Sequence, residues 1–186
     1  FNNRIYGLTK GQYSPTSEVG KITSSTPMGS IDAPVRPLNV ALGAEATFVA
    51  RVVDTDAKLM QKVLTEAHNH RGTSLIEIYQ NCNVFNDGAF VHLTKGDVKK
   101  NAQLVLEEDK PMIFGKQKDK GLVFDGGQLK VATIGEDGIT EDDIVVHNPT
   151  QPDINMAFRL ASLNPPEFPV AMGIMRKVNR PTYNEA

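Results

Sequence analysis

The chain has 186 residues, of which 40% are hydrophobic and 23% are charged, and its formal net charge is −2. This length permits one well-buried core, and the small net charge excludes a basic surface for nucleic acid or anionic lipid. The sequence contains no long uncharged apolar run and no basic segment before an apolar one, so we expect no membrane span, no signal peptide and a cytoplasmic location. The single cysteine, Cys82, excludes an internal disulfide framework.

The beginning of the chain, F-N-N-R-I-Y-G-L-T-K-G-Q-Y-S-P-T-S, is polar and contains two glycines. Its first residue is predicted to end a strand, and Asn2 and Asn3 to open a loop. Gly7 and Gly11 allow that loop to turn tightly and its backbone to approach a ligand closely. Hydroxyl and amide groups, with Lys10 as a cation, suit a bound phosphate and its metal ion. A polar turn without a ligand is the alternative interpretation.

The next segment, 16–37, is rich in Ser, Thr, Pro and Gly, which predicts an extended surface connection that contacts a cofactor or a subunit. Residues 38–46 predict a short helix, and 47–53 and 74–79 predict strands. A helix between these strands is predicted to start at Asp54 or Thr55 and to end at a left-handed Gly72 cap. Its apolar face comprises Leu59, Met60, Val63, Leu64 and Ala67.

A strand, a helix and a second strand with short joints predict a crossover and a parallel sheet. Ligands of such sheets bind beyond the carboxyl ends of the strands. Asn2, Asn3 and Cys82 all follow predicted strand ends. We therefore expect these three side chains to lie near one another.

Glycines, charges and short apolar runs replace the alternation of strand and helix after residue 83. A helix is predicted over 98–106 and another over 153–163 with Asp153 as its cap. Short strands are predicted over four further segments, which are 111–115, 121–124, 128–134 and 144–147. The proline-containing tail from Asn164 is expected to wrap around a neighbour or to be partly disordered.

The opening stretch resembles the thiamine-diphosphate loop of the 2-oxoacid:ferredoxin oxidoreductases, in which I-Y-G-L-T-x-G-Q-x-S-P-T follows an amide pair. The runs S-S-T-P-M-G at 24–29, A-T-F-V-A-R at 46–51 and I-E-I-Y-Q-N-C at 76–82 extend the resemblance to the catalytic beta subunit. It implies an α/β fold with a parallel-sheet thiamine-diphosphate-binding domain. Residues 1–82 would form the C-terminal part of that domain, and 83–186 a smaller, irregular α+β extension.

In function, the resemblance, with Lys10 in the loop, implies a coenzyme A-dependent oxidative decarboxylation of 2-oxoglutarate, with electrons passing through a 4Fe–4S cluster to ferredoxin. Thiamine diphosphate and Mg²⁺ would be the other cofactors, and an alpha subunit the partner in a heterodimer. No Gly-Asp-Gly motif precedes the loop, so we expect the C-terminal part of a longer subunit. The alternatives are pyruvate or another 2-oxoacid as substrate, a cluster-free thiamine-dependent decarboxylase or dehydrogenase, and a non-catalytic phosphate-binding module.

The resemblance also implies roles for individual residues. The Asn3 side chain and the Ile5 carbonyl would bind Mg²⁺, and Cys82 would supply one cluster ligand. Lys10, beside Leu8, would pair with the distal carboxylate of 2-oxoglutarate, because a buried unpaired carboxylate is costly. A solvated lysine and a small buried cysteine are the alternatives for Lys10 and Cys82. The expected cofactor contacts are Asn3, Ile5, Tyr6, Gly7, Leu8 and Thr9.

Overall fold

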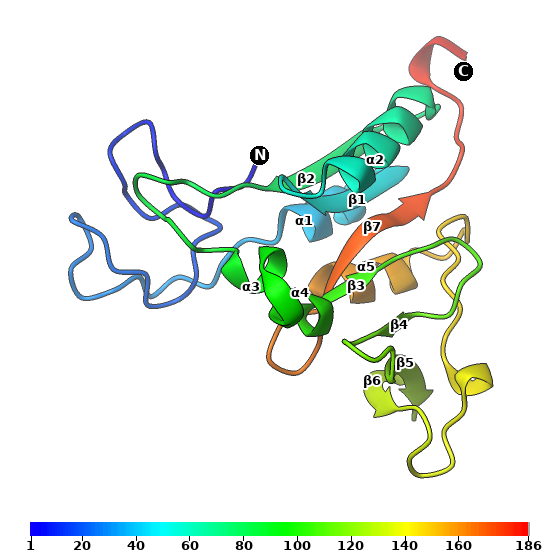
Figure 1. The fold of residues 1–186 in the computed structure, drawn as a ribbon. Helices are drawn as coiled ribbons and strands as arrows, with labels where there is room; N and C mark the ends of the chain where they lie inside the picture. The colour runs from blue at the N-terminus through cyan, green and yellow to red at the C-terminus, as the bar shows by residue number, and fades with distance from the viewer. Residues whose placement is uncertain (186) are drawn as a thin grey trace.

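The computed structural model describes residues 1–185 and contains a four-stranded sheet in the order β2-β1-β7-β3 (Figure 1). β1 (Phe48–Val53) pairs in parallel with β2 (Ser74–Tyr79) and antiparallel with β7 (Val170–Lys177). β7 in turn pairs in parallel with β3 (Gln103–Val105). Every residue of β1 is buried, since the strand is central and helices cover both of its faces.

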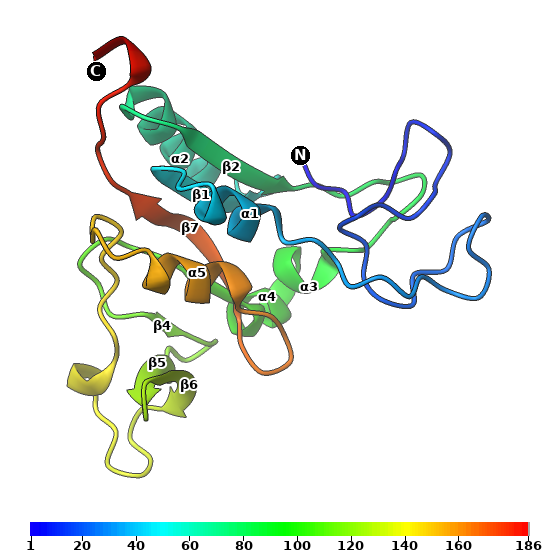
Figure 2. The ribbon, with the colours of Figure 1, turned by 180° about the vertical axis from the view of Figure 1, so that it is seen from behind.

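The helices pack on the two faces of this sheet (Figure 2). On one face, α2 (Ala57–Asn69) packs through Val63 against Phe48, Ala50 and Val52 of β1. On the opposite face, α1 (Pro37–Gly43) and α5 (Asn155–Ser162) pack against Val49. Alternate residues of β1 therefore serve different cores, as the period of a strand requires.

Shorter elements complete the fold. The helices α3 (Val91–Thr94) and α4 (Gly96–Ala102) precede β3, and single 3-10 turns span Glu141–Asp143 and Tyr183–Glu185. A separate antiparallel sheet joins β4 (Ile113–Phe114), β5 (Lys120–Asp125) and β6 (Gln128–Thr133). Within residues 1–185, no helix has the length and apolar character needed to cross a bilayer.

The small sheet shares the core of the large one. Phe114, Leu122 and Leu129 belong to the same buried cluster as Leu42 of α1 and Leu160 of α5. The second half of the chain also supplies β3 and β7 to the large sheet. Burial of apolar surface therefore ties the two halves together.

Two long loops, residues 1–17 and 18–36, project from the edge of the large sheet (blue in Figure 1). The first loop is attached at Asn2, which forms a parallel bridge with Tyr79 at the end of β2. The Asn2 amide donates to the Ile78 carbonyl at 2.8 Å, and the Gln80 amide donates to the Asn2 carbonyl at 3.1 Å. The loop thus begins at the carboxyl end of a parallel strand pair.

Most elements predicted from the sequence are confirmed. The short helix before β1, the strands β1 and β2, their parallel pairing and the intervening helix are all present. The three short strands of the small sheet are also confirmed, as is the helix near residue 160.

The predicted helix caps were wrong. The cap of α2 is Asp56, whose Oδ1 accepts from the Leu59 amide at 3.1 Å, and not Asp54 or Thr55. Helix α2 ends at Asn69, so Gly72 is not its cap. Gly72 has a φ of +138°, and a Cβ there would lie 2.1 Å from Thr47 Oγ1, so close approach explains this glycine.

Other boundaries were also wrong. The cap position of α5 is Ile154, although Asp153 Oδ1 accepts from the Asn155 amide at 3.0 Å. A helix was predicted over 98–106, but helix α4 ends at Ala102 and the chain continues as strand β3. The strand predicted over 144–147 is absent from the described residues; Val146 makes only an isolated bridge with Pro111.

The largest error concerns the tail. The sequence interpretation left 164–186 as a wrapping or disordered segment, yet Val170–Lys177 is the long strand β7 in the middle of the sheet. Its run V-A-M-G-I-M-R-K is poor in β-branched residues and contains a glycine, so its strand propensity is low. Burial between β1 and β3 outweighs that propensity.

A buried ion pair links β1 and β2. Arg51 Nε lies 2.8 Å from Glu77 Oε2, and the two side chains are 4% and 3% exposed. Arg51 also donates to the Ala161 carbonyl of α5 at 3.3 Å. Both charges are removed from water, so each depends on the other for compensation.

We predict that Glu77→Gln lowers the free energy of unfolding by about 3–5 kcal/mol, because it leaves the buried Arg51 charge without a counter-ion. Urea denaturation of the full-length protein measures the change. Asp125→Asn, which disrupts the exposed pair with Lys130, is the control and should change stability little. Equal effects of the two variants would contradict the importance of the buried pair.

Candidate functional site

The loop of residues 6–12 is closed by main-chain hydrogen bonds. The Tyr6 amide donates to the Gln12 carbonyl at 2.9 Å, and the Gly11 amide donates to the Tyr6 carbonyl at 2.8 Å. Lys10 and Gly11 reverse the chain direction with φ angles of +75° and +97°. The tip of the loop points into solvent, and Leu8 is 99% exposed.

The segment before this loop presents two oxygen atoms. Asn3 Nδ2 donates to the Gln80 carbonyl at 2.9 Å, which orients the side-chain amide. Among residues 1–185, neither Asn3 Oδ1 nor the Ile5 carbonyl oxygen receives a hydrogen bond. Amide and main-chain carbonyl oxygens are suitable ligands for Mg²⁺. The donor set therefore fits two positions of a magnesium site.

Arg4, between these two oxygens, has a φ of +53°. A left-handed conformation at a non-glycine residue costs on the order of 1–3 kcal/mol and persists where the surroundings impose it. Here the surroundings are polar. The Arg4 carbonyl accepts from Ser17 Oγ at 2.6 Å and from Asn86 Nδ2 at 3.3 Å, and its amide donates to Asn2 Oδ1 at 3.0 Å.

Asn2 and Asn3 have different roles. Asn2 Nδ2 donates to Glu77 Oε1 at 2.7 Å, and its Oδ1 also accepts from Thr16 Oγ1 at 2.7 Å. The side chain of Asn2 is thus fully used in anchoring the loop to β2. Asn3 keeps a free oxygen and is the candidate ligand of the pair.

Cys82 lies against the same loop. The sequence predicted this side of the sheet for Cys82 because it follows the end of a strand. A Cβ on Gly7 would be 3.7 Å from Cys82 Sγ. Main-chain N–H groups of Phe85, Val84 and Asn86 lower the pKa of the Cys82 thiol, because they stabilise the thiolate. Thiolates with such N–H donors are typical ligands of iron–sulfur clusters. Cys82 fits one cluster ligand, and within residues 1–185 no three or more His, Cys, Asp or Glu side chains are grouped so that they could hold a metal ion.

The Phe85 ring also packs on the loop. A Cβ at Gly11 would lie 2.7 Å from the Phe85 ring, and the φ of Gly11 is +97°. Both the close approach and the conformation require glycine. The two glycines of the opening stretch therefore bring the loop into contact with the segment that carries Cys82.

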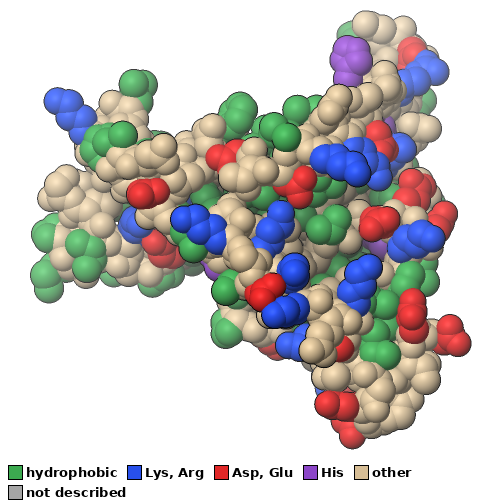
Figure 3. Space-filling view, in the orientation of Figure 1, with side chains coloured by type: hydrophobic (Ala, Val, Ile, Leu, Met, Phe, Trp, Pro, Cys, Tyr) green, Lys and Arg blue, Asp and Glu red, His purple; other side chains and the backbone are tan. Residues whose placement is uncertain are grey.

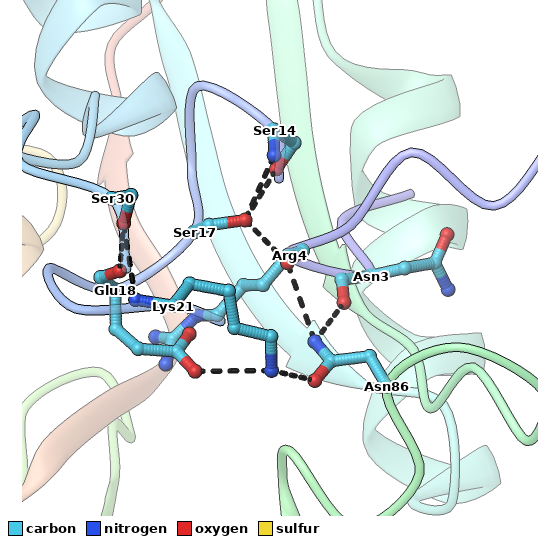
Figure 4. A network of polar contacts seen from close by, with 8 residues as sticks. All are labelled: Asn3, Arg4, Ser14, Ser17, Glu18, Lys21, Ser30 and Asn86. Atoms are coloured by element: carbon cyan, nitrogen blue, oxygen red, sulfur yellow. Dashed lines mark hydrogen bonds and ion pairs between the residues drawn. The ribbon is translucent and has the colours of Figure 1, made fainter. Parts of the chain in front are cut away.

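A polar network that the sequence interpretation missed surrounds this site (Figure 4). It joins the turn at Asn3 and Arg4 to Asn86, and Asn86 to Lys21 in the second projecting loop. Asn86 stands in N-D-G, which the sequence alone indicates only as a turn. The groups that accept from its Nδ2 are main-chain carbonyls, which leave no pattern in a sequence.

A cavity of about 320 Å³ lies on the other side of the turn and is lined by Arg4, Arg51, Glu77 and Tyr79 among others. Over residues 1–185, its lining includes neither Asn3 nor the loop of residues 6–12. The candidate ligands Asn3 and Ile5 and the loop tip therefore lie outside this cavity.

Three comparisons bear on the identity of the chain. Residues 1–78 match the family model described as "Thiamine pyrophosphate enzyme, C-terminal TPP binding domain". The whole chain is similar to the 2-oxoglutarate oxidoreductase subunit KorB of Mycobacterium tuberculosis, with 46% identity over 187 residues. Along its whole length the chain is therefore similar to a member of the beta-subunit family of the 2-oxoacid:ferredoxin oxidoreductases.

Other members of this family match the first half of the chain. A 2-oxoacid:ferredoxin oxidoreductase subunit beta from Saccharolobus solfataricus is 40% identical over 86 residues, which are 46% of this chain and 28% of that protein. The chain spans 49% of the length of the KorB relative from Mycobacterium tuberculosis. It therefore covers about half or less of these beta subunits.

A solved structure agrees with this similarity. The 2-oxoglutarate:ferredoxin oxidoreductase from Magnetococcus marinus, with 2-oxoglutarate, coenzyme A and succinyl-CoA bound, superposes with a TM-score of 0.66 at 26% identity. The match covers 98% of this chain and 47% of that one. It confirms the α/β class predicted from the sequence. The domain division at residue 82 stays a prediction.

We predict that Asn3→Leu weakens binding of thiamine diphosphate in the presence of Mg²⁺, because it removes an oxygen ligand. Loss of a residue that only orients a ligand costs roughly 10–100-fold in metal affinity, so loss of the ligand should cost at least as much. Titration calorimetry on the full-length protein measures the affinity. Asn3→Asp, which keeps an oxygen, should bind more tightly than Asn3→Leu; equal and undiminished affinities would exclude Asn3 as a ligand.

Proposed function

We propose that the protein is the catalytic subunit of an enzyme that oxidatively decarboxylates 2-oxoglutarate, transfers the acyl group to coenzyme A and reduces ferredoxin. The 46% identity along the whole chain to a subunit named for 2-oxoglutarate carries this proposal. The solved relative described with 2-oxoglutarate and succinyl-CoA bound supports the same substrate.

Thiamine diphosphate would be held at the turn and loop of residues 3–9. Asn3 Oδ1 and the Ile5 carbonyl would bind Mg²⁺, while Tyr6, Gly7, Leu8 and Thr9 would contact the cofactor. When bound, thiamine diphosphate supplies the thiazolium ring that carries the decarboxylation. The contribution of these residues is orientation, because the closed loop keeps its main chain in one conformation.

A 4Fe–4S cluster would receive the electrons, with Cys82 as one of its ligands. Four thiolates hold such a cluster, and this sequence contains a single cysteine, so the other three come from outside it. The proximity of Cys82 to Gly7, where an added Cβ would lie 3.7 Å from Sγ, supports this role, since it would keep the cluster beside the cofactor loop.

An alpha subunit would cover the projecting loops. Figure 3 shows apolar side chains at the end of the molecule formed by these loops. Leu8, Met28 and Ile31 are 99%, 94% and 91% exposed, an arrangement that fits a protein interface better than open solvent. Residues 1–82 would then be the cofactor-binding part and 83–186 the extension that contacts the cluster and the partner.

The direct test uses the full-length protein purified with its partner subunits. We expect reduction of ferredoxin that depends on both 2-oxoglutarate and coenzyme A, together with release of carbon dioxide. Iron and acid-labile sulfide should be present at four of each per cluster. Decarboxylation in a preparation that contains no iron would instead support the cluster-free class of thiamine enzymes.

We predict that Cys82→Ala lowers the iron content and the rate of ferredoxin reduction, because it removes one of the thiolate ligands. Thiamine diphosphate binding should be retained, since the cofactor ligands are on a different segment. Iron analysis and ferredoxin reduction are the measurements. Full iron content with normal electron transfer would make Cys82 a structural residue.

We predict that Lys10→Met reduces kcat/KM much more for 2-oxoglutarate than for pyruvate. Lys10 is exposed at the loop tip, where its ammonium group could pair with a distal carboxylate. A hydrogen bond to a charged group is worth about 1.5–3 kcal/mol, or roughly ten- to a hundredfold in specificity. Lys58→Met, at an exposed position on α2, is the control. Equal losses for the two substrates would contradict a role in substrate choice.

A further inference from the structure

The Asn86 side chain connects three segments of the chain at the candidate site (Figure 4). Its Nδ2 donates to the Asn3 carbonyl at 2.9 Å and to the Arg4 carbonyl at 3.3 Å. Its Oδ1 accepts from Lys21 Nζ, and its main-chain amide donates to the Cys82 carbonyl at 3.0 Å. Asn86 is only 6% exposed, so these contacts replace water almost completely.

The two carbonyls that Asn86 binds belong to the turn between the proposed oxygen ligands. Asn3 contributes its side-chain oxygen, and Ile5 its carbonyl, on either side of Arg4 with its positive φ. If both oxygens are to meet one ion, the main chain at Arg4 must stay in that conformation. Asn86 and Ser17 both donate to the Arg4 carbonyl and hold it there.

Lys21 helps to determine which way the Asn86 amide faces, in agreement with the two carbonyls, which can only accept. An ammonium group only donates, so its contact requires the carbonyl end of the amide and turns the NH₂ end toward the turn. Lys21 is itself fixed by Glu18, at 3.2 Å from its Nζ, and by Ser30 Oγ, which accepts from its main-chain amide at 3.1 Å. The second projecting loop therefore orients Asn86.

We propose that Asn86 is a positioning residue for magnesium, and that Lys21 orients it. Asn86 would hold the turn of residues 3–5 in the conformation that presents two oxygens to the ion, and would fix this turn relative to the Cys82 segment. The inference rests on the proposed function, since it assumes that the turn binds Mg²⁺. Asn86 itself does not contact the ion or the substrate.

Asn86→Asp tests the proposal in the intact enzyme with its partner subunits. The aspartate has the same shape but cannot donate, so both carbonyls lose the Asn86 hydrogen bond while the contact with Lys21 is kept. We expect the Kd for Mg²⁺, measured by calorimetry at saturating thiamine diphosphate, to rise about 10–100-fold. Asn83→Asp is the matched control, because Asn83 is exposed and its Oδ1 accepts only from Asn81 among the described residues. It should leave the Kd unchanged.

A spectroscopic readout separates positioning from general loss of stability. Mn²⁺ in place of Mg²⁺ should give a different electron paramagnetic resonance spectrum in Asn86→Asp than in the wild type and in Asn83→Asp. A changed unfolding temperature with an unchanged spectrum and unchanged Mg²⁺ affinity would overturn the proposal and leave Asn86 a structural residue.

Lys21→Met provides a second variant if Asn86→Asp fails to fold. It keeps both hydrogen bonds from Asn86 Nδ2 but removes the ammonium group that holds Oδ1, so the Kd for Mg²⁺ should rise severalfold, less than in Asn86→Asp. If Lys21→Met is the only variant that folds, a Kd for Mg²⁺ equal to that of the wild type would overturn the inference. Should the wild-type enzyme itself bind no thiamine diphosphate, the proposed function fails and the inference fails with it. Normal wild-type binding with unaffected variants refutes the inference alone.

Discussion

The position of the candidate site depends on the buried Glu77 carboxylate. One of its oxygens accepts from Arg51 Nε of β1, and the other accepts from Asn2 Nδ2 at the start of the loop. A charge with so little exposure needs both partners, because desolvation without compensation is costly. The same carboxylate therefore holds the two parallel strands together and attaches the loop of residues 1–17 at their carboxyl ends, where ligands of such sheets bind.

In the projecting loops, side-chain hydrogen bonds rather than helices or strands hold the main chain in place. The projecting loops bury few apolar groups, so their conformation depends on hydrogen bonds from Ser17, Asn86 and Thr16 to neighbouring segments. Such bonds are individually modest, and water competes with those at the surface. A bound cofactor and a subunit packed on the exposed tip would both stabilise this arrangement.

Sequence reasoning succeeded where a local pattern specifies a structure. Apolar periodicity identified α2, and β-branched runs identified β1 and β2. The prediction failed where contacts between distant segments determine the structure. β7 was missed because its own residues favour a strand only weakly, and its burial between β1 and β3 comes from segments far away in the chain. Gly72 was assigned to a cap because the side chain it accommodates, Thr47, lies on another element.

The same distinction applies within the site. Candidate ligands such as Asn3, Lys10 and Cys82 are visible in a sequence because their side-chain chemistry is distinctive. Residues that position them bind main-chain carbonyls, which every residue possesses, so nothing in the sequence of the turn indicates that Asn86 is its partner. Gly7 and Gly11 are an intermediate case. Their presence indicates a close approach, but only the fold identifies Cys82 and Phe85 as the groups that approach. The chemistry of this site can thus be inferred from each segment separately, whereas its geometry is determined by contacts between segments.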